Sequence, residues 1–171
     1  MKLRITSMTE DAAHAITAWR YEPPYSFYDS TPQDLRNLLN PEYAYFAIHT
    51  SDDKLIGFCC FGVDARVHGG QYDDPSASTI EDVGVGLRPD LAGKGFGRTF
   101  LAAVLEFRLD RSKPTRFGAT IATFNRRSIS LFEHLGFVKT HIFRTQTNQG
   151  GTEFVQMVRP ARQIKQPAKP T

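Results

Sequence analysis

Three alternating glycines, Gly93, Gly95 and Gly97, stand between a run rich in β-forming residues and a run whose apolar residues recur at helical spacing. They lie where a helix begins, and the first N–H groups of a helix have no acceptor within it. Such N–H groups, together with the helix dipole, bind phosphate and other anions. The sequence therefore predicts an anion site built from backbone rather than side chains. A tight turn without a ligand would need the same glycines, and for the glycines alone the two interpretations weigh equally.

Two common phosphate-binding motifs have a different spacing. A Walker A loop needs Ser or Thr directly after its Gly-Lys pair, whereas Lys94 is followed by Gly95. In a Rossmann dinucleotide site the third glycine would fall at Arg98, and an acidic residue would end the next strand, where the chain has Ile121-Ala122-Thr123. A nucleoside triphosphatase is therefore disfavoured, and a dinucleotide-dependent oxidoreductase is kept only as a minor alternative.

Two segments together resemble the GNAT acyltransferase superfamily. The run Ala92-Gly93-Lys94-Gly95-Phe96-Gly97 is similar to that family's acetyl-CoA loop, whose pattern is Gln or Arg, two residues, Gly, one residue, then Gly or Ala. Ala92 departs from this pattern at its first position. The segment from Asn125 to Leu135-Gly136-Phe137 resembles the family's Asn-led helix, which ends in Leu-Gly-Phe. The resemblance covers about residues 44–158 and is strongest over 81–137.

The resemblance implies acetyl-CoA as the co-substrate, with no metal. The pyrophosphate would lie on backbone N–H groups of the glycine loop, which Ala92 leaves available. The pantetheine arm would pair with N–H and C=O groups near Val85 and Leu87, and an N–H near Val85 would stabilise the tetrahedral oxyanion. The predicted cofactor contacts are Val85, Leu87, Ala92, Gly93, Lys94, Gly95, Phe96, Gly97, Arg98, Asn125 and Phe132, whereas Arg126 and Arg127 are assigned to the solvated surface.

The strand predicted over 80–87 carries an open face and a candidate base. Gly84 and Gly86 leave one face without side chains, so a slim partner can approach the backbone there. An amine must lose a proton before it attacks a thioester, which requires a base or a chain of waters. Glu81 lies eleven positions before Ala92, the offset of the base glutamate in histone-type members of the family. Two alternatives stay open: Asp82 as the base, since a bulge would exchange the faces of the two carboxylates, and a plain ion pair for Glu81.

The proton for the departing thiolate has no donor at the position that the resemblance indicates. Many family members carry a tyrosine in the Asn-led helix at the position of Phe132, which donates no proton. A thiol with a pKa of about 8.5 lies about 1.5 units above neutral pH, so departure as the thiolate costs about 2 kcal/mol. Solvent or another tyrosine could serve instead.

An aromatic loop at 19–28 is the candidate for binding the acceptor, because the family places its first helices over the substrate cleft. Tyr25, Phe27 and Tyr28 could form the walls, although aromatic residues more often serve packing. The predicted activity is direct transfer of an acetyl group to an amine, on a small molecule or a protein. A non-catalytic acyl-CoA sensor is the alternative, which CoA release with a panel of amines would exclude.

The elements that must position these residues follow from periodicity and turn signals. Their order predicts a mixed α/β fold in one GNAT-type domain over 1–159, with a central mixed, mostly antiparallel sheet flanked by helices on both faces. The remaining 160–171 is predicted to be a disordered tail, and 65–78 a flexible loop. The predicted strands are 3–5, 42–49, 54–63, 80–87, 116–121, 137–143 and 152–158, and the predicted helices are 11–19, 31–39, 98–109 and 125–135.

Composition limits the partners and the compartment. The net charge of +3 is spread along the 171 residues rather than gathered into a stripe, so we expect no nucleic-acid partner. Cys59 and Cys60 are adjacent and form no disulfide framework, which indicates a reducing cytoplasm. No apolar run approaches the ~18 residues of a membrane span. The histidines show no metal-binding spacing, and a homodimer is left open.

Overall fold

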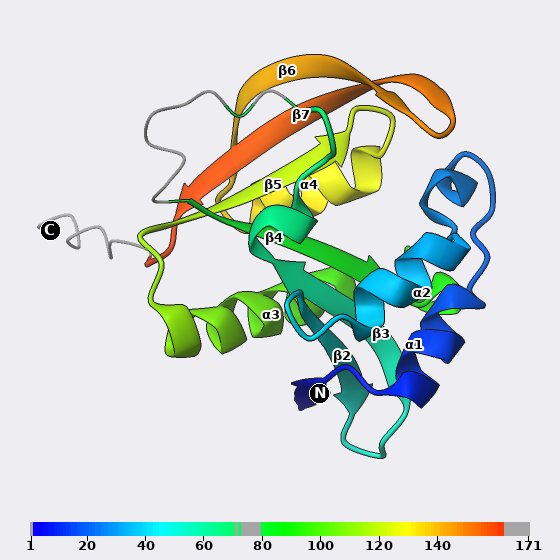
Figure 1. Ribbon diagram of the computed structural model, residues 1–171. Helices are drawn as coiled ribbons and strands as arrows, with labels where there is room; N and C mark the ends of the chain where they lie inside the picture. Colours follow the sequence, from blue (N-terminus) through cyan, green and yellow to red (C-terminus); the bar gives the residue numbers. More distant parts are fainter. Residues whose placement is uncertain (1, 71, 73–79, 163–171) are drawn as a thin grey trace, which may run out of the picture.

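The computed structural model describes residues 2–70, 72 and 80–162 (Figure 1). The helices within these residues are α1 Glu10–Thr17, α2 Pro32–Leu39, α3 Gly97–Ser112 and α4 Arg126–His134. The strands are β1 Leu3–Ser7, β2 Ala44–Thr50, β3 Leu55–Phe61, β4 Ile80–Leu87, β5 Arg116–Ala122, β6 Val138–Thr147 and β7 Gly150–Pro160.

The strands form one sheet in the order β1-β2-β3-β4-β5-β7-β6. Neighbouring strands run antiparallel, except β4 and β5, which are parallel and are connected through α3. The predicted mixed, mostly antiparallel sheet is therefore confirmed.

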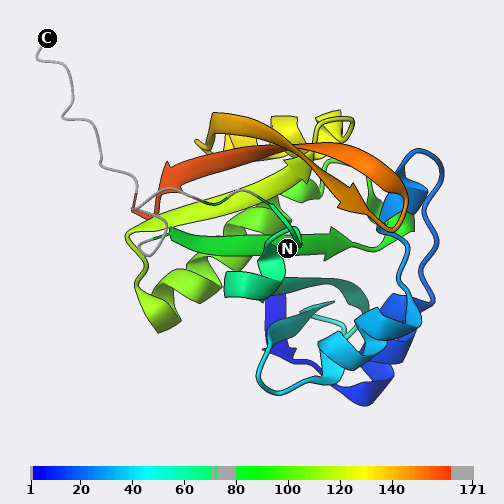
Figure 2. The same ribbon diagram turned by 45° about the horizontal axis from the view of Figure 1, so that its top comes forward.

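The β4–β5 pair separates after a short contact. Ile80, Glu81 and Asp82 pair with Arg116, Phe117 and Gly118, in that order. Beyond these pairs, β4 continues along β3 and β5 continues along β7, and the two strands diverge (Figures 1 and 2). Beyond Asp82, the edge of β4 that faces β5 has no strand partner within the described residues, and we call the region between the two diverging strands the slot. Unpaired strand edges can bind extended partners.

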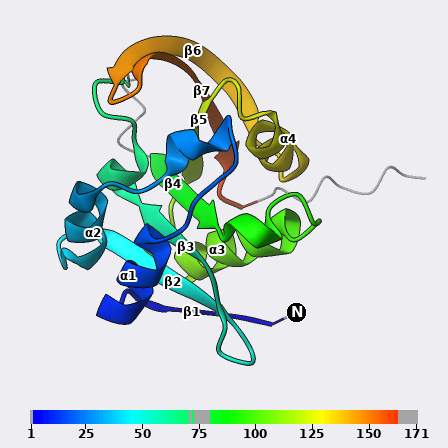
Figure 3. The ribbon, with the colours of Figure 1, turned by 90° about the vertical axis from the view of Figure 1, so that its right-hand side faces the viewer.

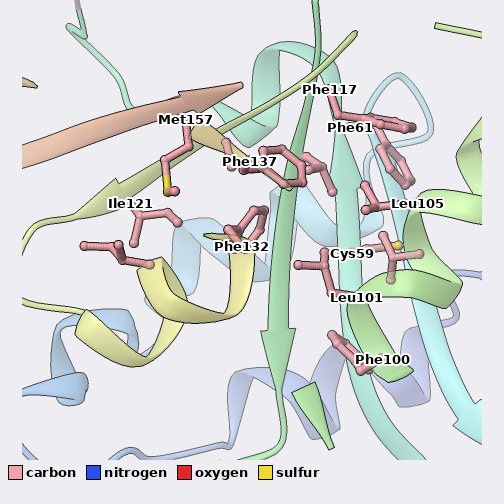
Figure 4. Close-up of a cluster of buried hydrophobic side chains, with 14 of the residues drawn as sticks. Cys59, Phe61, Phe100, Leu101, Leu105, Phe117, Ile121, Phe132, Phe137 and Met157 are labelled. Atoms are coloured by element: carbon pink, nitrogen blue, oxygen red, sulfur yellow. The ribbon is translucent and has the colours of Figure 1, made fainter. Parts of the chain in front are cut away.

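Helices cover both faces of the sheet, with α1 and α2 on one side and α3 and α4 on the other (Figure 3). The larger core lies under α3 and α4, where Leu101, Phe117 and Met157 are fully buried (Figure 4). A smaller cluster joins α1 and α2 to the opposite face through Ile16, Leu38 and the ring of Phe58. Each large side chain buried in this way stabilises the fold by about 1.5–3 kcal/mol.

Side chains cap the starts of two helices. The Thr9 hydroxyl accepts from the N–H of Ala12 at 3.2 Å and begins α1. Asn125 Oδ1 accepts from the N–H of Ser128 at 3.1 Å and begins α4, and Gly136, with φ of 84°, follows its end. These caps fix where α4 starts, directly after β5.

The predicted tail begins inside β7, which continues to Pro160. Ala161 is 2% exposed and donates its N–H to the Thr115 carbonyl at 2.9 Å. Residues 163–171 of the predicted tail, and 71 and 73–79 of the predicted loop, lie outside the described residues. No helix in the described ranges has both the length and the apolar character that a membrane span requires.

Candidate active site

The glycine loop presents open backbone at the start of α3. Gly93 and Gly95 have φ of 77° and 82°, a left-handed conformation that strains other residues. Apart from Gly95 and its two chain neighbours, no atom of the described residues lies within 4 Å of the place a Cβ would take at Gly95. The first turn of α3 adds N–H groups that have no acceptor inside the helix. The geometry therefore suits an anion; we call residues 93–98 the cradle.

Two residues of the predicted loop, Gly97 and Ala92, make contacts within the fold. A Cβ on Gly97 would lie 3.0 Å from a methyl group of Leu131, so this glycine lets α3 approach α4. The N–H of Ala92 donates to the Pro89 carbonyl at 3.2 Å. The preceding turn therefore uses this N–H, and the predicted contact of Ala92 with the cofactor stays a prediction.

Arg127 is exposed, as expected for the solvated surface, and it lies beside the cradle. One of its guanidinium nitrogens is 3.7 Å from the place a Cβ would take on Gly93. The same guanidinium lies 4.8 Å from the centre of the Tyr25 ring. α4 thus brings a cation to a loop more than thirty positions earlier in the chain, a proximity with no signal in the sequence. Arg98 is exposed in the first turn of α3. Both cations complement phosphate oxygens.

The faces of β4 differ from the sequence-based expectation. The place of a Cβ on Gly84 lies 2.7 Å from Cys60 Sγ, and that on Gly86 overlaps the Phe58 ring. The glycines therefore admit side chains of β3, not an external partner, so the open approach to β4 is its edge. At the end of that edge the Leu87 carbonyl accepts from the Tyr21 hydroxyl at 2.9 Å.

Tyr21 keeps its proton over a wide pH range. Burial, with a smaller contribution from the negative charge of Asp29, raises the pKa of Tyr21 to about 12. Its hydroxyl therefore remains a donor to the Leu87 carbonyl at physiological pH.

Glu81 and Asp82 point to opposite faces of β4. The β3–β4 register runs without a bulge from Phe61 opposite Val83 to Gly57 opposite Leu87. Glu81 Oε1 lies 2.6 Å from Arg108 Nη2 on α3, so the ion-pair interpretation describes its surroundings. Its role as a base stays a prediction.

Asp82 lies on the other face, at the point where β4 and β5 separate. It is 1% exposed, and its Oδ2 accepts from Arg66 Nε at 2.6 Å. Its Oδ1 has no hydrogen-bond partner within the described residues. Burial raises the pKa of Asp82, although Arg66 opposes this shift.

A pocket of about 330 Å³ opens on the side of α1 and α2. Its walls are mainly apolar and aromatic, two carboxylates lie among them, and the β6–β7 turn closes one side. The lining residues are Ile16, Phe27, Tyr28, Asp29, Ser30, Thr31, Asp34, Leu38, Tyr45, Phe58, Thr147, Asn148 and Gln149. Of the three predicted acceptor residues, Phe27 and Tyr28 line this pocket, whereas Tyr25 lies against Arg127.

The two pocket carboxylates were not predicted. Asp29 Oδ1 accepts from the N–H of Tyr21 at 2.9 Å, and Asp34 Oδ2 accepts from the N–H of Thr31 at 2.6 Å. The Thr31–Asp34 spacing was a visible signal for a capping box, but not for a pocket. Two negative charges within aromatic walls favour a positively charged ligand.

The aromatic loop joins the pocket to the far side of the slot. The Phe27 ring centre lies 5.3 Å from that of Phe124, between β5 and α4. The Tyr28 hydroxyl accepts from Asn125 Nδ2 at 3.2 Å. Because Tyr21 is bound to the end of β4, the loop spans from one side of the slot to the other.

Phe132, a predicted cofactor contact, is 2% exposed, and its ring packs 4.9 Å from that of Phe137 (Figure 4). Its contact with the cofactor stays a prediction. The described residues hold no group of His, Cys, Asp and Glu side chains suited to a metal.

Comparisons with known proteins agree with this architecture. A sequence model of the acetyltransferase (GNAT) family matches residues 11–137. No curated protein matches the sequence.

Solved structures share the fold at low identity. AAC(6')-Ib in complex with ribostamycin and coenzyme A is 17% identical, with a TM-score of 0.74 over 99% of this chain and 100% of that chain. A spermidine N-acetyltransferase SpeG chimera from Vibrio cholerae and hSSAT is 15% identical, with a TM-score of 0.71 over 94% and 96%. A GNAT-family acetyltransferase from Bacillus anthracis is 17% identical, with a TM-score of 0.71 over 94% and 96%.

Proposed function

Since the chain belongs to the acetyltransferase (GNAT) family, we propose that it transfers an acetyl group from acetyl-CoA directly to an amine of a small, positively charged acceptor. The single observation that carries the acceptor class is the pocket, which combines aromatic walls with the carboxylates of Asp29 and Asp34. Aromatic faces and carboxylates both attract ammonium groups.

The donor side fits acetyl-CoA. The cradle offers backbone N–H groups and open space for the pyrophosphate, and Arg127 and Arg98 lie at its border. The edge of β4 near Val85 offers backbone groups to an extended arm, and the slot between β4 and β5 is where such an arm can enter. Bound acetyl-CoA supplies a thioester whose carbonyl carbon is the electrophile. An N–H near Val85 then stabilises the oxyanion.

The acceptor must present one neutral amine. At pH 7 an amine with a pKa of about 10.4 needs about 4.6 kcal/mol to lose its proton, and one near 8 needs about 1 kcal/mol. Carboxylates near the reacting amine would raise this cost, because they favour the ammonium form. An acceptor with two amines avoids the conflict, since one ammonium can bind Asp29 and Asp34 while the other amine reacts. Two structures that share the fold are a spermidine N-acetyltransferase and an aminoglycoside acetyltransferase, whose named compounds carry several amines.

The base is proposed from the family resemblance. Glu81 would need to act from its ion pair with Arg108, while Asp82 lies on the face of β4 that carries the pocket. Glu81→Gln is expected to lower the rate mainly on the alkaline-rising limb of the pH profile. An unchanged profile would remove Glu81 from the mechanism.

The test is CoA release, measured with a thiol reagent, when the protein and acetyl-CoA are mixed with single amines. The panel is spermidine, putrescine, butylamine, kanamycin and a peptide with a free α-amine. We expect release with the diamines and polyamines in preference to butylamine. Binding of acetyl-CoA without release for any amine would overturn the proposal and favour an acyl-CoA sensor.

Two variants distinguish binding of the acceptor in the pocket from a general effect of the protein's net charge. Asp29→Asn is expected to raise KM for the best diamine by about tenfold, because it removes one charge-assisted contact of about 1.5 kcal/mol. Asp110→Asn on the exposed side of α3 makes the same charge change outside the pocket and is the control. Equal KM values in both variants would contradict the assignment of the pocket.

A further inference from the structure

The departing thiolate needs a proton that the core of α4 cannot supply. Phe132 has no hydroxyl and is 2% exposed. Any protein donor must therefore come from another element that reaches the slot. This inference rests on the proposed function, because it assigns a residue to the same reaction.

The hydroxyl groups of two tyrosines near the slot already donate hydrogen bonds to other groups of the protein. The Tyr21 hydroxyl donates to the Leu87 carbonyl at 2.9 Å, and the Tyr72 hydroxyl donates to Thr120 Oγ1 at 3.2 Å. A hydroxyl with a fixed acceptor must break that bond before it can protonate a leaving group. Neither residue is therefore a ready donor.

Tyr28 differs in the direction of its hydrogen bonds. Its oxygen accepts from Asn125 Nδ2 at 3.2 Å and has a hydrogen bond with the backbone of Ala122 that stabilises the phenolate. Within the described residues, no acceptor for its own proton is found. The oxygen is thus held by donors while its proton stays available.

The position of Tyr28 is equally specific. Its bond to Asn125 places the hydroxyl at the head of α4, which borders the slot on the β5 side. The same side chain lines the acceptor pocket and is 40% exposed. It therefore lies where the slot, which admits the donor, meets the pocket, which admits the amine.

Burial keeps the Tyr28 phenol protonated. It raises the pKa of Tyr28 above its ordinary 10.0, while the hydrogen bonds from Asn125 and Ala122 oppose the shift. The phenol is therefore protonated between pH 7 and pH 9. Its Asn125 and Ala122 contacts also stabilise the phenolate that remains after proton transfer.

We propose that Tyr28 is the catalytic acid that protonates the CoA thiolate. As the tetrahedral intermediate collapses, its C–S bond breaks and the electron pair goes to sulfur. The Tyr28 hydroxyl proton then forms the S–H bond of CoA. The phenolate regains a proton from solvent, which has received the proton lost by the acceptor amine, so the step is balanced.

The test is the single-turnover acetylation rate, with the best amine of the panel, from pH 7 to pH 9.5, for Tyr28→Phe and for a protein in which Tyr28 is replaced by 3,5-difluorotyrosine, whose phenol has a lower pKa. Departure of the thiolate without an acid does not depend on pH, so Tyr28→Phe is expected to be about 100-fold slower than the wild type at every pH. The difluorotyrosine protein should lose its rate at a lower pH than the wild type, because its phenol ionises and can then donate no proton. The KM for acetyl-CoA is expected to stay unchanged.

The pH dependence of the difluorotyrosine protein distinguishes catalysis from packing. If its rate falls at no lower pH than that of the wild type, the assignment is overturned, as it is by a wild-type rate in Tyr28→Phe. Tyr43→Phe removes a hydroxyl outside the pocket and is the control. A wild-type protein that acetylates no amine overturns the proposed function itself, whereas an active wild type together with either of those two results overturns only the role of Tyr28.

Discussion

A methyl group at Gly95 tests the cradle, because this glycine is strained but unobstructed. Its φ is 82°, and apart from its chain neighbours nothing within the described residues lies within 4 Å of the added carbon. Gly95→Ala therefore costs only the left-handed conformation, about 1–2 kcal/mol of unfolding free energy. Gly62 has φ of 78° and equally open space, but it follows β3 rather than the cradle. Gly62→Ala is thus a matched control for strain.

The two variants are expected to differ in cofactor binding. If the open space at Gly95 holds the pyrophosphate, the methyl group displaces it from at least one backbone N–H. A hydrogen bond to a charged group contributes about 1.5–3 kcal/mol, so the affinity for coenzyme A should fall by about ten- to a hundredfold. Gly62→Ala should leave that affinity unchanged.

The assays are urea denaturation, for the free energy of unfolding, and isothermal titration calorimetry with coenzyme A. Equal losses of stability with a loss of affinity only in Gly95→Ala would support the cradle. A Gly95→Ala protein that binds coenzyme A like the wild type would refute the reasoning, because the anion would then lie elsewhere.

Two further predictions concern charges that the tertiary structure brings into place. Arg127→Ala is expected to weaken coenzyme A binding about tenfold, because it removes a cation beside Gly93. Arg126→Ala on the same helix is the control and should change the affinity little. Calorimetry measures both affinities, and equal effects would contradict the placement of Arg127 beside the bound coenzyme A. Arg66→Met leaves the buried Asp82 carboxylate unpaired and should lower the free energy of unfolding by about 3 kcal/mol at pH 7. Burial raises the folded-state pKa of Asp82, so the protonated carboxyl stabilises the fold at low pH, and this contribution is lost as the pH rises through that pKa. In urea titrations, the difference in unfolding free energy between the wild type and Arg66→Met should therefore become smaller toward pH 4. A deficit that does not vary with pH would contradict this explanation.

Much of the fold followed from local patterns. Alternating apolar residues predicted the strands, and helical spacing predicted the buried face of α3, because these periodicities reflect which side chains face a core. Thr9 and Asn125 cap α1 and α4, and such caps depend only on residues within one turn. Strand ends were less well predicted, as at Pro160, where pairing with β5 extends β7.

The site was predictable only where it is made of consecutive residues. Gly93 and Gly95 were identified because their left-handed conformation is a local property of the backbone. Asp29 and Asp34 were missed as pocket residues, because their shared surroundings arise when the loop before α2, together with α2 itself, folds over β2 and β3. Their local roles, in a loop contact and a capping box, gave no indication of a ligand.

The sequence by itself determined the family, the elements and the backbone loop that can hold an anion, because each depends on residues close together in the chain. Only the tertiary structure decided which side chains meet across long separations. It turned Glu81 toward α3 and Asp82 toward the other face, filled the space over Gly86 with Phe58, and brought Arg127 to the cradle. These outcomes depend on strand register and helix packing, which no single segment specifies.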